Sequence, residues 1–196
     1  VGIGEMGIGN TTTSSAVLAA LTGAPVEALT GRGGGLTDSA FETKKRVIQQ
    51  ALDLHRPPQD DPVAVLSMVG GLDLAAMTGA FLGCAREGVA AVVDGFISVV
   101  AALCAARLCP AAKDMMFLSH ASYEAGYRLA ADELGLEPCL LLGMRLGEGS
   151  GCPLMFRVLQ GACAVLRDMA TFAEGEIQDD YLAPIRAMDA FTVENT

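Results

Sequence analysis

Four short apolar runs, each followed by a polar or glycine-rich turn and a helix-like segment, constrain the fold of this chain more than any other feature. The runs are residues 63–69, 89–93, 115–118 and 139–142, and the helices expected after them cover about 72–86, 96–108, 122–134 and 153–172. Continuous apolar strands that alternate with helices are typical of a parallel sheet with helices on both faces. The sequence therefore predicts an α/β fold, a Rossmann-like three-layer sandwich, over residues 1–173.

Segments outside the four repeats complete this prediction. Two further helices are expected over residues 11–21 and about 38–54, with Ser39 and Glu42 spaced as a capping box at the start of the second. Residues 174–196 are more polar, and we expect them to form a C-terminal tail within a small helical subdomain. The chain opens on glycines and not on methionine, so we expect it to be a piece of a longer protein.

Charge and hydropathy exclude several functional classes. The formal net charge is -10, whereas nucleic-acid binding needs a basic surface, so no nucleic-acid partner is expected. The mean hydropathy is +0.41, but the longest apolar run without a charge, residues 96–106, is shorter than the roughly 20 residues of a membrane span. The six cysteines form no C-x-x-C pair, which favours reduced thiols over a metal site. We expect a cytoplasmic protein without a membrane partner.

The predicted topology alone locates a ligand site. In open parallel sheets, ligands bind outside the carboxyl ends of the strands. Those positions are Gly70-Gly71, Asp94-Gly95, residues 119–122 and residues 145–151. Polar residues of otherwise apolar segments gather there, so the site is expected at this edge.

Glycines near the N-terminus allow three interpretations. Gly2, Gly4 and Gly7 form G-x-G-x-x-G before a helix, which is the pattern of a dinucleotide fingerprint, although no strand is expected before it. The same glycines could instead expose amides that bind an anion at the helix start, or form only a structural turn. The loop at residues 31–35 with Lys44 could be a second phosphate-facing element, or Lys44 could lie on a solvated helix face. His120 is equally open to a structural and a catalytic interpretation.

Glu148 is the sharpest single candidate. It lies between Gly147 and Gly149 in a loop after a buried run, where close backbone approach suggests a ligand. We expect an apolar recess there, which would disfavour the charged form of the glutamate and suit it to general acid or base catalysis. A purely structural role for Glu148 is the alternative.

Five strings together resemble the nicotinate-nucleotide–dimethylbenzimidazole phosphoribosyltransferase family. They are GEMGIGNTT at 4–12, GRGGGL at 31–36, DGFIS at 94–98, SHASYEAGY at 119–127 and MRLGEGSG at 144–151. The resemblance covers nearly the whole chain and only the carboxyl-terminal part of a family member. One departure is Tyr127, where the family commonly has histidine.

The resemblance implies an activity and a set of site residues. It implies transfer of 5-phosphoribosyl from nicotinate mononucleotide to 5,6-dimethylbenzimidazole, giving α-ribazole 5′-phosphate and nicotinate, without a metal or other cofactor, in a homodimer. Glu148 would be the general base that removes the azole proton. The residues expected to bind substrate are Glu5, Gly7, Lys44, Asp94, Gly95, Ser122, Arg145, Leu146 and Gly147.

Two other functions compete with this one. The chain could be a noncatalytic module that holds a nucleotide phosphate but does not turn over. It could also be a nicotinamide-dinucleotide oxidoreductase, an interpretation that depends on the G-x-G-x-x-G pattern alone.

Overall fold

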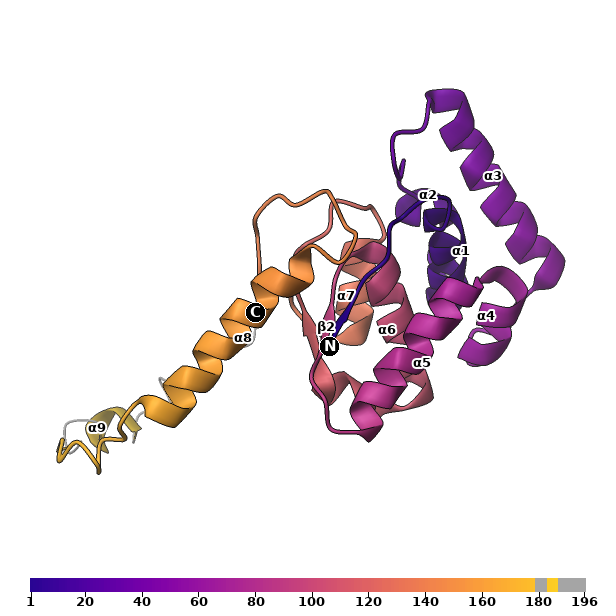
Figure 1. Ribbon diagram of the computed structural model, residues 1–196. Helices are drawn as coiled ribbons and strands as arrows, with labels where there is room; N and C mark the ends of the chain where they lie inside the picture. The colour runs from indigo at the N-terminus through magenta and orange to yellow at the C-terminus, as the bar shows by residue number, and fades with distance from the viewer. Residues whose placement is uncertain (179–182, 187–196) are drawn as a thin grey trace. The chain divides into compact units, whose positions relative to one another are not determined.

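Three short parallel strands organise the part of the protein that the structure describes (Figure 1). They are β1 (Gly2–Ile3), β2 (Ala91–Val93) and β3 (Met116–Leu118), in the order β1-β2-β3. Val92 in the central strand pairs with Gly2 on one side and with Phe117 on the other. The computed structural model describes residues 1–178 and 183–186. Over these residues it confirms an α/β fold built on a parallel sheet.

The two strand-to-helix steps at the centre of the chain follow the prediction closely. β2 leads into α6 (Phe96–Leu108), and β3 is reached through a 3₁₀ turn, η1 (Pro110–Met115), and followed by α7 (Tyr127–Leu134). Residues 96–105 of α6 are all buried, which explains why this helix is apolar on every side. α5 (Leu72–Arg86) and α6 both contact β2, and the fully buried Phe81 and Leu103 belong to the core between these elements.

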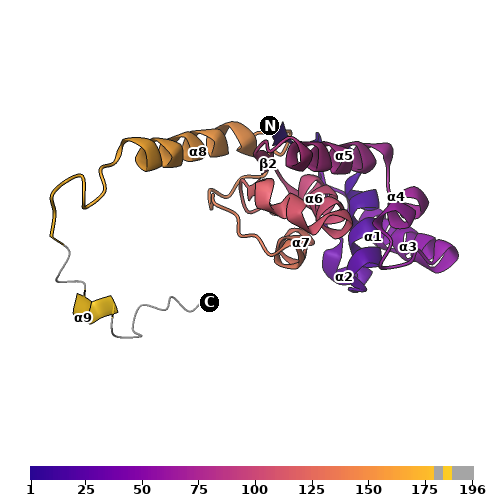
Figure 2. The same ribbon diagram turned by 90° about the horizontal axis from the view of Figure 1, so that it is seen from below.

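A second group of helices within residues 1–157 lies near the N-terminus of the chain (Figure 2). They are α1 (Thr11–Thr22), α2 (Val26–Leu29) and α3 (Asp38–His55), and α1 packs against both α2 and α3. The helices expected over 11–21 and 38–54 are therefore confirmed. The expected capping box is wrong: Thr37 is the N-cap of α3 and accepts a hydrogen bond from the Ala40 amide, while Glu42 pairs with Lys45.

The first apolar run is a helix and not a strand. Residues 63–69 belong to α4 (Pro62–Val69), whose N-cap Asp61 accepts hydrogen bonds from the amides of Val63 and Ala64. Proline at the first helical position is preorganised for a helix and needs no amide partner. Asp61 and Pro62 together start a helix, and this local signal outweighs the apolar run.

The last apolar run, residues 139–142, is also not a strand. It makes one isolated bridge, between Leu140 and His120, and the side chains of Leu141 and Leu142 are exposed. β1 contains Gly2, so a strand does stand at the glycine-rich start where none was expected. The helix expected over 122–134 begins only at Tyr127.

The chain divides into two compact units after Arg157, and this boundary falls within α8 (Gly151–Asp168). The second unit contains the rest of α8 and α9 (Ala183–Arg186) among its described residues. The boundary at 173 and the helical tail over 174–196 remain predictions, since residues 179–182 and 187–196 lie outside the described residues. None of the helices in the described part is both long enough and apolar enough to cross a membrane.

Candidate active site

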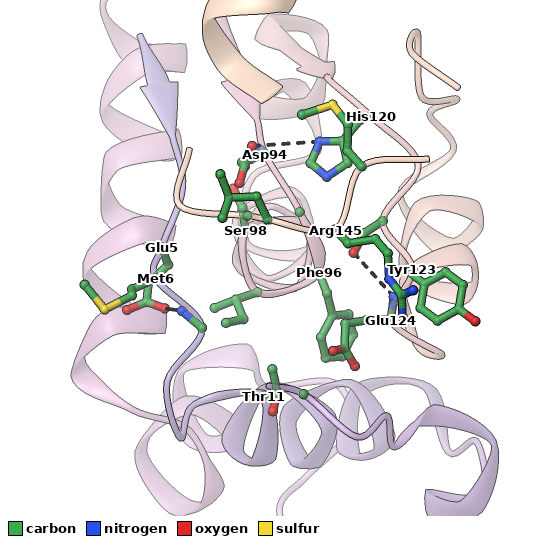
Figure 3. Close-up of a pocket in the computed structure, with 18 of the residues that line it drawn as sticks. Glu5, Met6, Thr11, Asp94, Phe96, Ser98, His120, Tyr123, Glu124 and Arg145 are labelled. Atoms are coloured by element: carbon green, nitrogen blue, oxygen red, sulfur yellow. Dashed lines mark hydrogen bonds and ion pairs between the residues drawn. The ribbon is translucent and has the colours of Figure 1, made fainter. Parts of the chain in front are cut away.

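A cavity of about 190 Å³ lies at the carboxyl ends of the strands (Figure 3). Its walls come from five stretches of chain: residues 5–7 with Thr11, Gly33 and Gly34, residues 94–98, His120 with residues 122–124, and residues 144–147. Three of the four loops expected at this edge therefore line one cavity. Gly70-Gly71 follows a helix and is not among its lining residues.

Two helices begin at the cavity wall. Gly95 is the N-cap of α6, it offers no side chain to cap the helix, and Phe96, Ile97 and Ser98 of the first turn line the cavity. Thr11, the first residue of α1, lines it as well. The first amides of a helix have no intrahelical acceptor, and the helix dipole adds positive charge at that end. This part of the cavity is suited to an anionic ligand.

Glu5 and Gly7 form the turn between β1 and α1. The Glu5 carboxylate accepts a 2.6 Å hydrogen bond from the Gly7 amide, and Gly7 has a φ of +84°, which favours glycine. The Glu5 carbonyl oxygen accepts a 3.1 Å hydrogen bond from the Glu148 amide. This turn therefore holds the start of the Glu148 loop, which we define as residues 147–151.

Asp94 is buried at the end of β2, and its carboxylate faces the Glu148 loop. One oxygen, Oδ2, accepts a 3.0 Å hydrogen bond from the Gly149 amide. The other, Oδ1, accepts a 2.8 Å hydrogen bond from the amide of Gly151, the first residue of α8. Asp94 also lines the cavity, so it connects the cavity wall to the start of α8.

His120, for which the sequence leaves a structural and a catalytic role open, lies buried in the cavity wall beside Asp94. Its Nδ1 atom is 3.0 Å from the Ser119 hydroxyl and 3.8 Å from Asp94 Oδ1. The Ser119 hydroxyl donates its own proton to the Asp94 carbonyl oxygen at 3.0 Å. In the hydrogen bond between Ser119 and His120, the imidazole Nδ1–H is therefore the donor and the hydroxyl oxygen the acceptor. Burial lowers the pKa of His120, against the opposing effect of the Asp94 charge. Both neighbours lie on the Nδ1 side, so these three residues do not form a relay that activates Ser119 as a nucleophile.

Lys44 is buried, so the alternative of a solvated helix face is wrong for this residue. Its Nζ atom donates hydrogen bonds of 2.8 Å to the Thr11 hydroxyl and to the Gly31 carbonyl oxygen. Burial lowers the pKa of Lys44, while the nearby negative charge of Glu124 raises it. Lys44 does not line the cavity, but Thr11 does, so the ammonium lies directly behind the wall.

The remaining expected residues lie on and beside the Glu148 loop. Arg145, Leu146 and Gly147 line the cavity, and the Arg145 guanidinium lies 4.0 Å from the centre of the Tyr123 ring. Glu148 is exposed and is not among the lining residues. The apolar recess expected around it is therefore absent from the described part of the protein. Glu148 has a left-handed φ of +57°, between Gly147 at +72° and Gly149 at +76°.

The structure thus sorts the expected residues into two groups. Two lie just outside the cavity lining, Lys44 and Glu148, and the others line it: Glu5, Gly7, Asp94, Gly95, Ser122, Arg145, Leu146 and Gly147. The lining residues that the sequence reasoning missed include Thr11, Ser98, Tyr123 and Glu124. Most of them belong to the strings GEMGIGNTT, DGFIS and SHASYEAGY. These lining residues could therefore be found from the whole strings, but not from their residue types taken one at a time.

Charged groups of both signs face the cavity. Glu5, Asp94 and Glu124 supply carboxylates and Arg145 supplies a guanidinium. One carboxylate oxygen of Glu124, Oε2, is buried without a hydrogen-bond partner among the described residues. No group of three or more His, Cys, Asp or Glu side chains in the described ranges is placed to hold a metal ion.

Comparisons with known proteins agree on one family. A family model described as "Phosphoribosyltransferase" matches residues 1–177. The nicotinate-nucleotide–dimethylbenzimidazole phosphoribosyltransferase of Clostridium perfringens (strain ATCC 13124) is 52% identical over 193 residues, covering 98% of this chain and 54% of the relative. The enzyme of the same name from Desulforamulus reducens is 50% identical over 177 residues, covering 90% of this chain and 50% of the relative.

A solved structure shares the fold. The crystal structure of CobT from Thermus thermophilus superposes with a TM-score of 0.84 at 39% sequence identity, covering 91% of this chain and 53% of that chain. The chain therefore spans about half the length of the relatives that it matches.

Proposed function

The chain belongs to the nicotinate-nucleotide–dimethylbenzimidazole phosphoribosyltransferase family, and from this we propose that its cavity takes part in the reaction after which the family is named. Nicotinate mononucleotide would lose nicotinate, and 5,6-dimethylbenzimidazole would take its place, giving α-ribazole 5′-phosphate. The observation that carries this proposal is the cavity at the strand ends. All five strings that resemble the family contribute residues to its lining, and α6 begins there without a side-chain N-cap.

The nucleotide phosphate is proposed to bind at the helix starts. The amides of Gly95 and the first turn of α6 supply donors, and Gly7, which lies close to Ile97, lines the cavity beside them. Lys44 adds a positive charge behind Thr11 and the glycine loop. With the phosphate there, the ribose is proposed to contact Glu5 and Ser122, and the bases to lie along residues 145–147, all of which line the cavity.

Glu148 is the proposed general base. One azole nitrogen forms the new bond to C1′ of ribose with inversion, and the C1′–N bond to nicotinate breaks, so that its electron pair neutralises the pyridinium nitrogen. The proton on the other azole nitrogen passes to the Glu148 carboxylate. The leaving group is already activated by its positive charge, so orientation, a base and stabilisation of oxocarbenium-like charge are the main contributions required of the protein.

A cytoplasmic homodimer is part of the same proposal. Exposed apolar side chains along α8 support a second copy of the chain as a partner; they include Leu154, Val158, Val165 and Leu166. Sedimentation equilibrium of the purified chain measures this directly, and a monomer at micromolar concentration would contradict the dimer.

Nicotinate release from nicotinate mononucleotide, with and without dimethylbenzimidazole, tests the proposed reaction. Release that depends on the azole supports the transferase. Nucleotide binding without release supports the noncatalytic module, and binding of a reduced dinucleotide detected by its fluorescence supports the oxidoreductase.

Glu148→Gln tests the proposed base. General base catalysis contributes about 10²- to 10⁴-fold, so kcat should fall by that amount while the Kd for nicotinate mononucleotide, from titration calorimetry, stays unchanged. A kcat equal to that of the parent chain would remove Glu148 from this role.

A further inference from the structure

We infer that Asp94 is a positioning residue that fixes the Glu148 loop in its catalytic conformation, a role separate from any contact with the ribose phosphate. The inference rests on the proposed function only for the role of Glu148. The contacts of Asp94 themselves come from the structure.

Both oxygens of the Asp94 carboxylate are used by this loop. Oδ2 accepts from the Gly149 amide at 3.0 Å and Oδ1 from the Gly151 amide at 2.8 Å. These two donors stand on the C-terminal side of Glu148. On the other side, the Glu148 amide itself donates to the Glu5 carbonyl oxygen. The peptide that carries Glu148 is therefore attached to the cavity wall on both sides.

The loop needs such attachment because its backbone is in a costly conformation. Gly147, Glu148 and Gly149 all have φ between +57° and +76°, and glutamate pays a steric penalty in this region that glycine does not. A residue held in a sparsely populated conformation persists only where surrounding contacts fix it. Among the described residues, three hydrogen bonds join this loop to segments distant in the sequence, and Asp94 accepts two of them.

A carboxylate suits this position better than a neutral side chain. Two amides with fixed positions need two acceptor oxygens, and asparagine would offer one oxygen and one donor. The charge is also favourable at the start of the 18-residue helix α8, whose first residue is Gly151.

Asp94 is in turn held by its own neighbours. Its amide donates to the Ser98 hydroxyl at 3.4 Å, and its carbonyl oxygen accepts from Ser119 at 3.0 Å. The carboxylate is 2% exposed, and His120 Nδ1 lies 3.8 Å away. The backbone of Asp94 is thus held at the end of β2 while its carboxylate bonds the loop, so the residue links the position of β2 to that of the loop.

Amide hydrogen exchange measured by NMR tests the two hydrogen bonds without depending on activity. In the parent chain, the Gly149 and Gly151 amides should exchange at least about tenfold more slowly than unbonded loop amides, because a hydrogen bond to a charged acceptor is the barrier to opening. In Asp94→Asn, at least one of the two should exchange about 10- to 100-fold faster than in the parent. Unprotected amides in the parent chain would overturn the inference.

Glu124→Gln is the matched control. It makes the same carboxylate-to-amide change in the same cavity, but Glu124 Oε2 has no hydrogen-bond partner in the described part of the chain. Exchange of the Gly149 and Gly151 amides should be unchanged in this variant. Equal acceleration in both variants would show a general effect of lost charge and would refute the specific role of Asp94.

Gly151→Ala perturbs the same contact from the loop side and retains the carboxylate. A Cβ at position 151 would lie 2.5 Å from His120 Nδ1, 2.5 Å from the Ser119 hydroxyl oxygen and 2.9 Å from Asp94 Oδ1, so either the loop or these side chains must shift, and the contact with Asp94 changes in both cases. Faster exchange at Gly149 in this variant supports the inference, and parent-like exchange contradicts it. This second variant keeps the test available if Asp94→Asn does not fold.

Kinetics then separate this inference from the proposed function. A positioning role predicts that Asp94→Asn lowers kcat by at least about tenfold while the KM for nicotinate mononucleotide changes less than about threefold. A raised KM at constant kcat would instead make Asp94 a binding residue. If the Gly149 and Gly151 amides of the parent chain are protected from exchange but the chain releases no nicotinate, the proposed function is contradicted. The anchoring of the loop by Asp94 would still stand in that case.

Discussion

Gly4→Ala should displace the Glu148 loop from a site that makes no hydrogen bond to it. A Cβ on residue 4 would lie 2.6 Å from the Gly149 Cα atom and 2.7 Å from the Gly149 nitrogen. These are backbone atoms, so rotation of a side chain cannot relieve the overlap. The same Cβ would lie 3.1 Å from Asp94 Cβ, so residue 4 cannot relieve the overlap by moving toward Asp94.

The size of the displacement sets the size of the effect. Carbon atoms prefer separations of about 3.5–4.0 Å, so the Gly149 backbone must move by roughly 1 Å. Overpacking of this kind costs about 1–3 kcal/mol of unfolding free energy, which lowers Tm by about 2–12 °C in a domain of this size. A misplacement of about 1 Å at a catalytic group can cost about 10²-fold in rate.

Differential scanning fluorimetry and azole-dependent nicotinate release measure the two effects. Gly79→Ala is the control, because residue 79 lies on exposed α5 surface where a Cβ meets no atom within 4 Å. That change should raise the unfolding free energy by about 0.5–1 kcal/mol and leave turnover unchanged. If Gly4→Ala kept the parent Tm and the parent kcat, the close approach of residues 4 and 149 would be refuted.

Three further predictions concern the core, the buried lysine and pH. Phe81→Ala should lower the unfolding free energy by about 3–5 kcal/mol in urea denaturation, because Phe81 is fully buried; a loss below about 1 kcal/mol would contradict its place in the core. Lys44→Ala should weaken nicotinate mononucleotide binding by about tenfold in calorimetry, through lost charge and loss of the bonds to Thr11 and Gly31; unchanged affinity would remove Lys44 from the phosphate site. Burial holds the pKa of His120 below 6.5 in the folded state, so as the pH falls the imidazole is protonated in the unfolded chain before it is protonated in the folded one. Protonation therefore favours the unfolded chain, and the unfolding free energy should fall as the pH drops below 6.5. His120→Gln should flatten that decline in urea titrations between about pH 7.5 and 5.5, and an identical slope would refute the assignment.

The sequence predicts the elements whose signals are local. β2 and α6 were predicted within two residues, because a short apolar run, the turn Asp94-Gly95 and a long apolar helix follow one another directly. Residues 63–69 were misassigned although a local signal was present. Asp61 before Pro62 marks a helix start, and the apolar run was given more weight than this cap.

Side-chain direction at the site was beyond sequence reasoning. Periodicity in α3 places Lys44 near the polar side, and only its partners Thr11 and Gly31, which come from other segments, reveal that it is buried. Glycines around Glu148 correctly indicated close backbone approach, yet the approach is made by Gly149 to Gly4, while the Glu148 side chain is exposed. Long-range contacts decide both cases, and no local pattern encodes them.

The order of strands in the sheet has a consequence for the folding path. β2 meets β3 across about 25 residues, with Ala91 paired to Met116, whereas it meets β1 across 90 residues, with Gly2 paired to Val92. Loop-closure entropy makes the longer connection costlier by about 1 kcal/mol. The segment from β2 through α6 to β3 can thus associate early as a local nucleus. Pairing of β1 with β2 also brings Gly4 against the Glu148 loop, so the costlier of the two strand pairings is the one that completes the site.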